Sequence, residues 1–146
     1  MNTVGDLVRG REVYSVQSDQ TVFEAVQYMV EKSIGAVAVM EGERMVGIFS
    51  ERDLMKRIVI KKLDPSALKL AQVMTTNLVV ANTGESYIAA LAKMQSHNIR
   101  HLAIVEGEKL VGIISLRDLM SKDIKEKSAE IELMNAYLYY TPPTGE

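Results

Sequence analysis

Residues 33–59 read SIGAVAVMEGERMVGIFSERDLMKRIV, and residues 98–124 read NIRHLAIVEGEKLVGIISLRDLMSKDI. The two stretches align without a gap at an offset of 65 residues. In this alignment 13 of the 27 columns are identical, far more than unrelated segments would share. A segment that occurs twice in a sequence without gaps indicates two copies of one structural unit.

The spacing of apolar residues predicts the same elements in each copy. A helix is expected first, because Thr21 and Ser86 each precede apolar residues at helical spacing and can cap a helix start. Two apolar runs around a polar turn then predict a hairpin, and a second helix pattern closes the copy. The expected ranges are 13–16 and 78–81 for an opening strand, 22–29 and 87–94 for the first helix, 36–40, 45–49, 101–105 and 110–114 for the hairpins, and 54–59 and 119–124 for the closing helix.

This order of elements predicts an α+β fold. A three-stranded sheet with two helices in roughly 60 residues leaves one sheet face bare. Two β-α-β-β-α repeats that pack sheet to sheet about a pseudo-twofold axis would cover that face. The expected divisions are 1–62 for repeat 1, 63–73 for a structured linker, 74–124 for repeat 2, 125–140 for a C-terminal helix and 141–146 for a disordered tail.

Composition excludes several classes of function. The 146 residues include 47% hydrophobic and 25% charged residues, which is typical of a globular chain, and no cysteine, so thiol chemistry is excluded. The formal net charge of −2 disfavours nucleic acid and anionic membranes as partners. The start of the chain does not look like a signal peptide, and no apolar run approaches the roughly 18 residues of a transmembrane helix. We therefore expect a cytoplasmic protein.

Each hairpin ends in one motif, GIFSERD at residues 47–53 and GIISLRD at residues 112–118. Ser followed three residues later by Asp is typical of a capping box at a helix start, and taken alone it favours a structural role. The same geometry can hold a ligand, because a helix start attracts phosphate and a carboxylate can accept hydrogen bonds from both hydroxyls of a ribose. Since Gly and Arg recur with the motif in both copies, we favour ligand binding over capping alone.

The doubled motif resembles that of a tandem pair of CBS domains, named after cystathionine β-synthase, an arrangement called a Bateman module. The stretches REVYSV, GIFSERDL, VMT and IRHL are also similar to the small stand-alone CBS pairs of bacteria and archaea. The resemblance covers residues 4–124. It implies that AMP, ADP or ATP, less often NAD or S-adenosylmethionine, binds in one or both clefts between the repeats, and that no cofactor is required.

The resemblance also implies two sets of ligand-binding residues. In each set the Asp would hold ribose hydroxyls, the Ser would contact phosphate or ribose, and the adenine would lie between the backbone of an Ile and the opening strand of the opposite repeat. Two Thr stand where such modules often place a hydroxyl on the ligand. The sets are Asp53, Ser50, Arg52, Ile48, Thr75, Thr76 and Val79 for one cleft, and Asp118, Ser115, Arg117, Ile113, Arg100, His101 and Tyr14 for the other.

The copies diverge at Arg100 and His101, which align with Gly35 and Ala36. The family often places basic residues here to hold phosphates. Arg supplies a forked donor, and His supplies a donor that titrates near neutrality. We therefore predict that the Asp118 cleft is the one that binds phosphate; the alternative is that both residues merely cover a surface strand.

The remaining motifs predict little chemistry. His97 and His101 are four residues apart, but the first is expected to end a helix and the second to begin a strand, so no metal site is predicted. The basic stretch at residues 56–62 favours a solvated helix face, with contact to the polyphosphate of ATP as the alternative. No local catalytic signature is present, which favours a binding module over an enzyme.

The sequence therefore predicts a non-catalytic adenine-nucleotide sensor that regulates an unidentified protein. The resemblance implies a homodimer, which the C-terminal helix would strengthen. One alternative is a structural or assembly module whose clefts stay empty. A weaker alternative is a nucleic-acid-binding CBS protein, which the net charge and the presence of only 2 Phe and no Trp disfavour.

Overall fold

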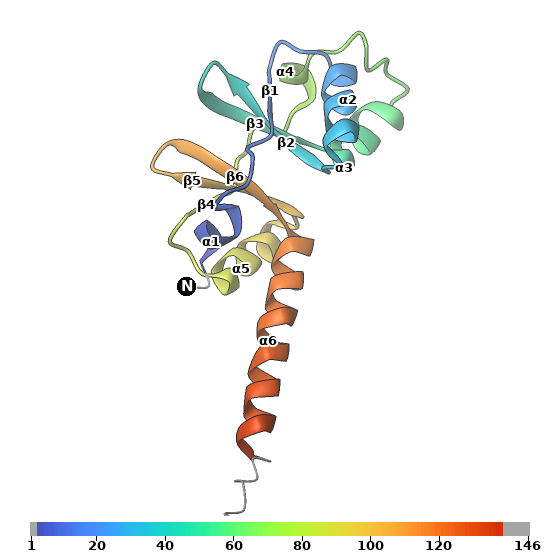
Figure 1. Cartoon of the computed structure of the whole chain (residues 1–146). Helices are drawn as coiled ribbons and strands as arrows, with labels where there is room; N and C mark the ends of the chain where they lie inside the picture. Colours follow the sequence, from blue (N-terminus) through green and yellow to red (C-terminus); the bar gives the residue numbers. More distant parts are fainter. Residues whose placement is uncertain (1–2, 139–146) are drawn as a thin grey trace, which may run out of the picture.

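Each copy of the repeated segment folds around a three-stranded sheet in the computed structural model, which describes residues 3–138 (Figure 1). In both sheets the first strand runs parallel to the second, and the second and third form an antiparallel hairpin. The strands are β1 (Ser15–Gln17), β2 (Ala36–Glu41) and β3 (Arg44–Ser50) in the first sheet, and β4 (Val80–Asn82), β5 (His101–Glu106) and β6 (Lys109–Ser115) in the second. The predicted α+β fold is confirmed.

The first helix of each repeat begins where its capping residue was predicted. Helix α2 (Val22–Lys32) follows Thr21, whose hydroxyl accepts a hydrogen bond from the Glu24 N–H. Helix α5 (Tyr87–His97) follows Ser86, which accepts from the Ala89 N–H in the same way. Both N-cap predictions are confirmed.

Two short helices that precede the repeats pack on the opposite repeat. Helix α1 (Val4–Val8) lies on the second sheet, where the Val4 N–H donates to the Glu85 carbonyl at 2.9 Å and Val4 is fully buried beside Leu102. Helix α4 (Leu70–Val73) lies on the first sheet, with Leu70 fully buried. The second core therefore includes residues from the start of the chain, and the first core includes residues from the segment that joins the repeats.

The second helices of the two repeats differ. In the first repeat α3 (Glu51–Asp53) continues into a π-helical stretch, η1 (Leu54–Val59). In the second repeat one helix, α6 (Leu116–Leu138), spans 23 residues and includes both of the helices expected at 119–124 and 125–140. The expectation of a separate C-terminal helix is thus wrong for residues up to 138, because neither Pro nor Gly interrupts the segment. Residues 139–140 of that expected helix, and the expected tail at 141–146, lie outside the described residues.

Helix α6 starts beside the second sheet and extends away from both sheets (Figure 1). Among the residues that the structure describes, no helix combines the length and the apolar character needed to cross a membrane.

A candidate nucleotide cleft beside Asp118

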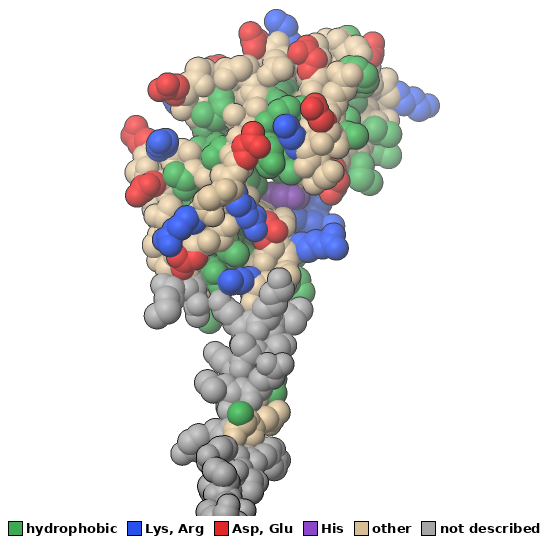
Figure 2. Space-filling model, viewed as in Figure 1, with side chains coloured by type: hydrophobic (Ala, Val, Ile, Leu, Met, Phe, Trp, Pro, Cys, Tyr) green, Lys and Arg blue, Asp and Glu red, His purple; other side chains and the backbone are tan. Residues whose placement is uncertain are grey.

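A cleft between the two repeats has a cavity volume of about 1460 Å³. Ligand pockets in proteins commonly enclose about 300–1,000 Å³, so a nucleotide has room here. Figure 2 shows a histidine side chain, in purple, in the recess between the repeats with basic side chains beside it. All seven residues predicted for the Asp118 set line this cleft, namely Tyr14, Arg100, His101, Ile113, Ser115, Arg117 and Asp118.

Asp118 is held at the cleft by its own helix start. Its Oδ2 accepts a hydrogen bond from the Ser115 N–H at 2.9 Å, and the Ser115 hydroxyl accepts one from the Asp118 N–H at 3.0 Å. The predicted capping box is therefore present. Arg11 Nη1 also lies 3.3 Å from Oδ2, whereas Oδ1 makes no hydrogen bond or ion pair with any residue of the described part. One carboxylate oxygen thus remains available as an acceptor.

The surroundings of Asp118 keep it ionised. Burial by itself raises the pKa of this carboxyl, but the hydrogen bonds from Ser115 and the charge of Arg11 outweigh that effect and hold the pKa below its ordinary value. An ionised carboxylate accepts hydrogen bonds and donates none. Asp118 is therefore suited to hydroxyl groups such as those of a ribose.

Tyr14 is fixed in the cleft wall by contacts within the first repeat. Its carbonyl accepts a hydrogen bond from the Ala38 N–H at 3.4 Å. Its ring meets that of Tyr28 edge to face, with the ring centroids 6.2 Å apart, and Lys32 Nζ lies 6.0 Å from the Tyr14 centroid. The first repeat thus presents a preformed surface opposite the Asp118 motif of the second.

Charges of both signs line the cleft. Glu51 of the first repeat and His101 of the second repeat both approach Gly35. A Cβ at Gly35 would lie only 3.1 Å from Glu51 Oε1 and 3.2 Å from His101 Nε2, so the glycine makes room for both side chains. Such a mixture suits a ligand that has anionic phosphates and neutral hydroxyls. The charged or titratable lining residues are Arg11, Arg100, Arg117, His101, Glu12, Glu51 and Asp118.

His101 is mostly withdrawn from water in this wall. Burial lowers its pKa below the ordinary value of 6.5. The carboxylates of Glu51 and Asp118 oppose that shift without cancelling it. Arg100 and Arg52 lower the pKa further. His101 is therefore neutral at pH 7.

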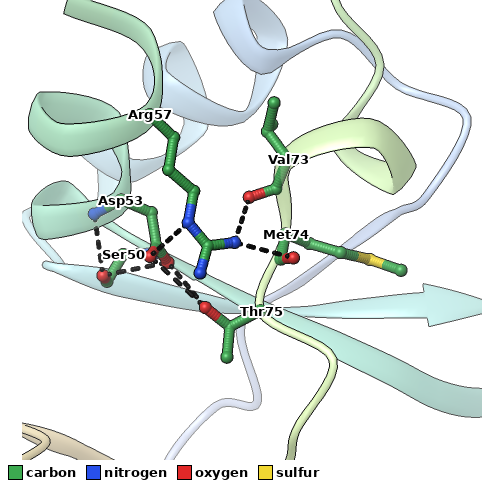
Figure 3. Close-up of polar contacts among 6 residues, drawn as sticks. All are labelled: Ser50, Asp53, Arg57, Val73, Met74 and Thr75. Carbon is green, nitrogen blue, oxygen red and sulfur yellow. Dashed lines mark hydrogen bonds and ion pairs between the residues drawn. The ribbon is translucent and has the colours of Figure 1, made fainter. Parts of the chain in front are cut away.

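The equivalent motif in the first repeat faces protein groups instead (Figure 3). Asp53 Oδ2 accepts from the Ser50 N–H at 3.0 Å, and Asp53 Oδ1 lies 3.3 Å from the Thr75 hydroxyl. Ile48 and Thr75 exchange two backbone hydrogen bonds of 2.9 Å each. The structure therefore brings together four predicted residues of the Asp53 set, but in direct contact with one another.

The other three residues of the Asp53 set lie apart from that cluster. Arg52 donates to the Asn98 carbonyl at 3.2 Å and lines a smaller cavity of about 260 Å³. Val79 packs against the core of the second repeat, and Thr76 is exposed. A ligand-binding role for either set of residues stays a prediction.

Two site residues were missed by sequence reasoning. Arg11 aligns with Thr76 at the offset of 65, so the repeat that singled out Thr76 also contained the signal for Arg11. Arg57 was assigned to a solvated helix face, but its guanidinium donates to the carbonyls of Val73 and Met74. The prediction is therefore wrong for Arg57 and confirmed for Lys56, which is exposed on η1. Lys61 and Lys62 are exposed as expected, but they lie in the turn that follows η1.

No cluster of three or more His, Cys, Asp or Glu side chains among the described residues has an arrangement that could hold a metal ion.

Comparison with known families identifies two domains. The CBS domain family matches residues 4–60 and again residues 70–125. The CBS domain-containing protein YhcV of Bacillus subtilis is 33% identical over 135 residues, which cover 92% of this chain and 95% of YhcV. The chain also matches 22% of the length of the inosine-5'-monophosphate dehydrogenase of Methanocaldococcus jannaschii at 33% identity over 114 residues, which cover 77% of this chain, so similar pairs occur both alone and within longer proteins.

Solved structures agree with this fold. A protein with CBS domains from Burkholderia ambifaria superposes with a TM-score of 0.80 at 32% identity, covering 84% of this chain and 94% of the other. A CBS domain protein of Pyrobaculum aerophilum, solved in complex with AMP, has a TM-score of 0.73 at 26% identity, covering 80% of this chain and 88% of the other.

Proposed function

The chain belongs to the CBS domain family, as a pair of these domains, and from this premise we propose that it is a non-catalytic adenine-nucleotide sensor whose ligand binds beside Asp118. The observation that carries the proposal is the cleft of about 1460 Å³, which all seven residues of the Asp118 set line. The AMP complex of the Pyrobaculum aerophilum protein supports the choice of an adenine nucleotide.

The lining residues suggest where the ribose, the phosphate and the adenine of a nucleotide lie in the cleft. The ribose hydroxyls donate to the free Oδ1 of ionised Asp118. The phosphate lies toward Arg100 and His101, where a forked cation and an imidazole are available. The adenine lies between Tyr14 and the backbone of Ile113, which come from different repeats.

A ligand in this cleft contacts both repeats and therefore favours one packing of the repeats over others. A partner protein that recognises that packing would sense the nucleotide, and the nucleotide and the partner would alter each other's affinity by the same factor. The partner protein is unidentified, and the cytoplasmic location stays a prediction from the sequence.

We also propose a homodimer, as the family resemblance implies. Exposed apolar side chains on α6 support this, because Ile131, Met134 and Leu138 are 57%, 61% and 66% exposed. Their spacing of three and then four residues is that of a coiled-coil seam, for which a second copy supplies a matching surface.

One observation favours the rival function of a structural or assembly module. Both Ser-x-x-Asp motifs form capping boxes, so each Asp has a role in the fold without any ligand. In that case Asp118→Asn would lower the melting temperature, and added nucleotide would leave the melting temperature of the unaltered protein unchanged.

Calorimetric titration with AMP, ADP, ATP, NAD and S-adenosylmethionine tests the proposal. We expect at least one adenine nucleotide to bind, and Asp118→Asn to weaken its binding by about tenfold or more, since a hydrogen bond to a charged group contributes about 1.5–3 kcal/mol. Asp19→Asn is the matched control, because Asp19 is exposed and is not among the residues that line the cleft. If none of these compounds binds the intact protein, the proposal is wrong.

A further inference from the structure

We infer that the cleft beside Asp53 is closed and acts as a structural clasp between the repeats, so that each chain takes one nucleotide and not two. The count of nucleotides rests on the proposed function, whereas the clasp rests on the contacts around Asp53 alone. The two repeats allow a direct comparison, because every residue of one motif has its counterpart 65 positions away.

The first observation is that the carboxylate of Asp53 is fully engaged. Its Oδ2 accepts from the N–H and the hydroxyl of Ser50 at 3.0 and 3.2 Å. Its Oδ1 faces the Thr75 hydroxyl at 3.3 Å and the Arg57 Nε at 3.7 Å (Figure 3). In Asp118 the corresponding oxygen has no such partner in the described part of the chain. A ribose at Asp53 would have to displace protein groups.

The second observation concerns the backbone that would face the adenine. Ile48 is joined to Thr75 by a pair of hydrogen bonds, and no bridge of this kind joins Ile113 to a facing segment among the described residues. The counterpart of Thr75 is Gly10, whose φ is 77°. A Thr would adopt this left-handed conformation only with strain, so the chain takes a different path at Gly10.

The third observation is that residues 73–75, which precede the second sheet, cover the strand β3 at Gly47. A Cβ at Gly47 would lie 2.6 Å from Met74 Sδ and 3.0 Å from the Thr75 carbonyl oxygen. A flexible Met side chain can move aside, but the Thr75 backbone cannot move without breaking its pair with Ile48. The covering segment is therefore anchored beside the motif.

The fourth observation is that Arg57 ties this segment to the end of the motif. Its Nη1 donates to the carbonyls of Val73 and Met74 at 2.8 and 3.0 Å, while its Nε faces Asp53. The counterpart in the second repeat is Lys122, whose ammonium group lacks the planar fork that serves several acceptors at once. Arg57 is therefore the positioning residue of the clasp.

A smaller cavity of about 260 Å³ is lined by Arg52 and by residues of the second repeat, and Asp53, Ile48 and Thr75 are not among its lining residues. It is therefore not the counterpart of the cleft of about 1460 Å³, which Asp118 and Ile113 themselves line. The closure at Asp53 rests on the contacts of Asp53, Thr75 and Arg57, which differ from those of Asp118 although the two motifs have nearly the same sequence.

Calorimetric titration of the whole protein with AMP counts the sites. We expect one AMP per chain, with Asp53→Asn leaving both the count and the affinity unchanged and Asp118→Asn weakening the binding by about tenfold or more. Two molecules of AMP per chain, or a loss of half of the sites in Asp53→Asn, would overturn the inference.

Thermal unfolding without nucleotide tests the clasp separately. We expect Arg57→Ala to lower the melting temperature by about 3 to 8 °C, because two carbonyls and a carboxylate lose their donor. Lys56→Ala is the matched control, since Lys56 is exposed on the same element. Equal melting temperatures of these two variants would overturn the clasp. If no nucleotide binds, the proposed function fails, and this comparison still decides the clasp.

Discussion

Asp53 and Asp118 show how far the environment of one residue sets its chemistry. Both close a capping box with the Ser three residues earlier, because that contact depends only on local backbone geometry. They differ in what lies beyond the motif: Thr75 and Arg57 contact Asp53, and Arg11 contacts Asp118 from the side of an open cleft. Two nearly identical motifs therefore lie in different surroundings.

His101 makes the stability of the protein sensitive to pH. Its pKa in the folded state lies below 6.5, the ordinary value that applies to the unfolded chain, so the unfolded state binds more protons between the two values. Stability is expected to be complete above about pH 6.5 and to fall as the pH drops through the folded pKa. Melting temperatures between pH 7.5 and pH 5.5 should show this loss, and His101→Gln should reduce it.

The control for that experiment is His97→Gln, because His97 is exposed at the end of α5. An equal loss of stability in His101→Gln and in the unaltered protein would contradict the expectation.

At the scale of elements, the two cores are joined by exchanged segments. Leu70 lies within residues 70–125, the second family match, yet it is buried in the first core with Phe49 and Ile58. Val4 lies within the first match and is buried in the second core. The unit that folds is therefore the pair, and one repeat alone lacks part of its core.

Leu70→Ala is expected to reduce the free energy of unfolding by about 2–5 kcal/mol, the usual cost of truncating a fully buried Leu. Urea titration should detect this loss within one transition shared by both repeats, because each core contains a segment from the other. Leu63→Ala serves as the control, since Leu63 is 43% exposed. Two separate transitions, or a control that loses as much stability, would contradict this expectation.

The strands were predictable from the sequence, whereas helix α1 and the contacts of Arg57 were not. The hairpins predicted at 36–40 with 45–49 and at 101–105 with 110–114 agree with the observed strands to within one residue at each end, because apolar periodicity is a local signal. Helix α1 was not predicted, since five residues give too short a pattern and its burial depends on a sheet some 100 residues later. The contacts of Arg57 were missed for the same reason, because they depend on the path of a distant segment.

At the scale of the whole molecule, the two repeats differ at two places. Asp118 lines an open cleft whereas Asp53 contacts Thr75 and Arg57, and only the second repeat continues into a long helix. Ile131, Met134 and Leu138 lie on the part of α6 that extends away from the sheets (Figure 1). None of these three residues lines the Asp118 cleft.

Replacing two seam residues tests the proposed dimer. The double variant Ile131→Glu, Met134→Lys is expected to raise the dissociation constant of the dimer at least about tenfold, because charged groups at seam positions lose hydration on association. Sedimentation equilibrium measures this constant. Ala136→Glu on the same helix is the control, because Ala136 is exposed and lies off the seam. An unchanged constant in the double variant would show that the seam is not the interface.

The exchange of α1 and α4 also bears on the order in which the protein can fold during synthesis. The first core needs Leu70, and the second needs Val4 together with Ile114 and Leu119. When only residues 1–62 have left the ribosome, the first core still lacks Leu70. Helix α1 is synthesised first, but the second sheet on which it packs is completed only with β6. A nascent chain can therefore complete its first core once residue 74 has emerged, whereas Val4 and Val8 reach their core only after the second sheet and Leu119 have been made.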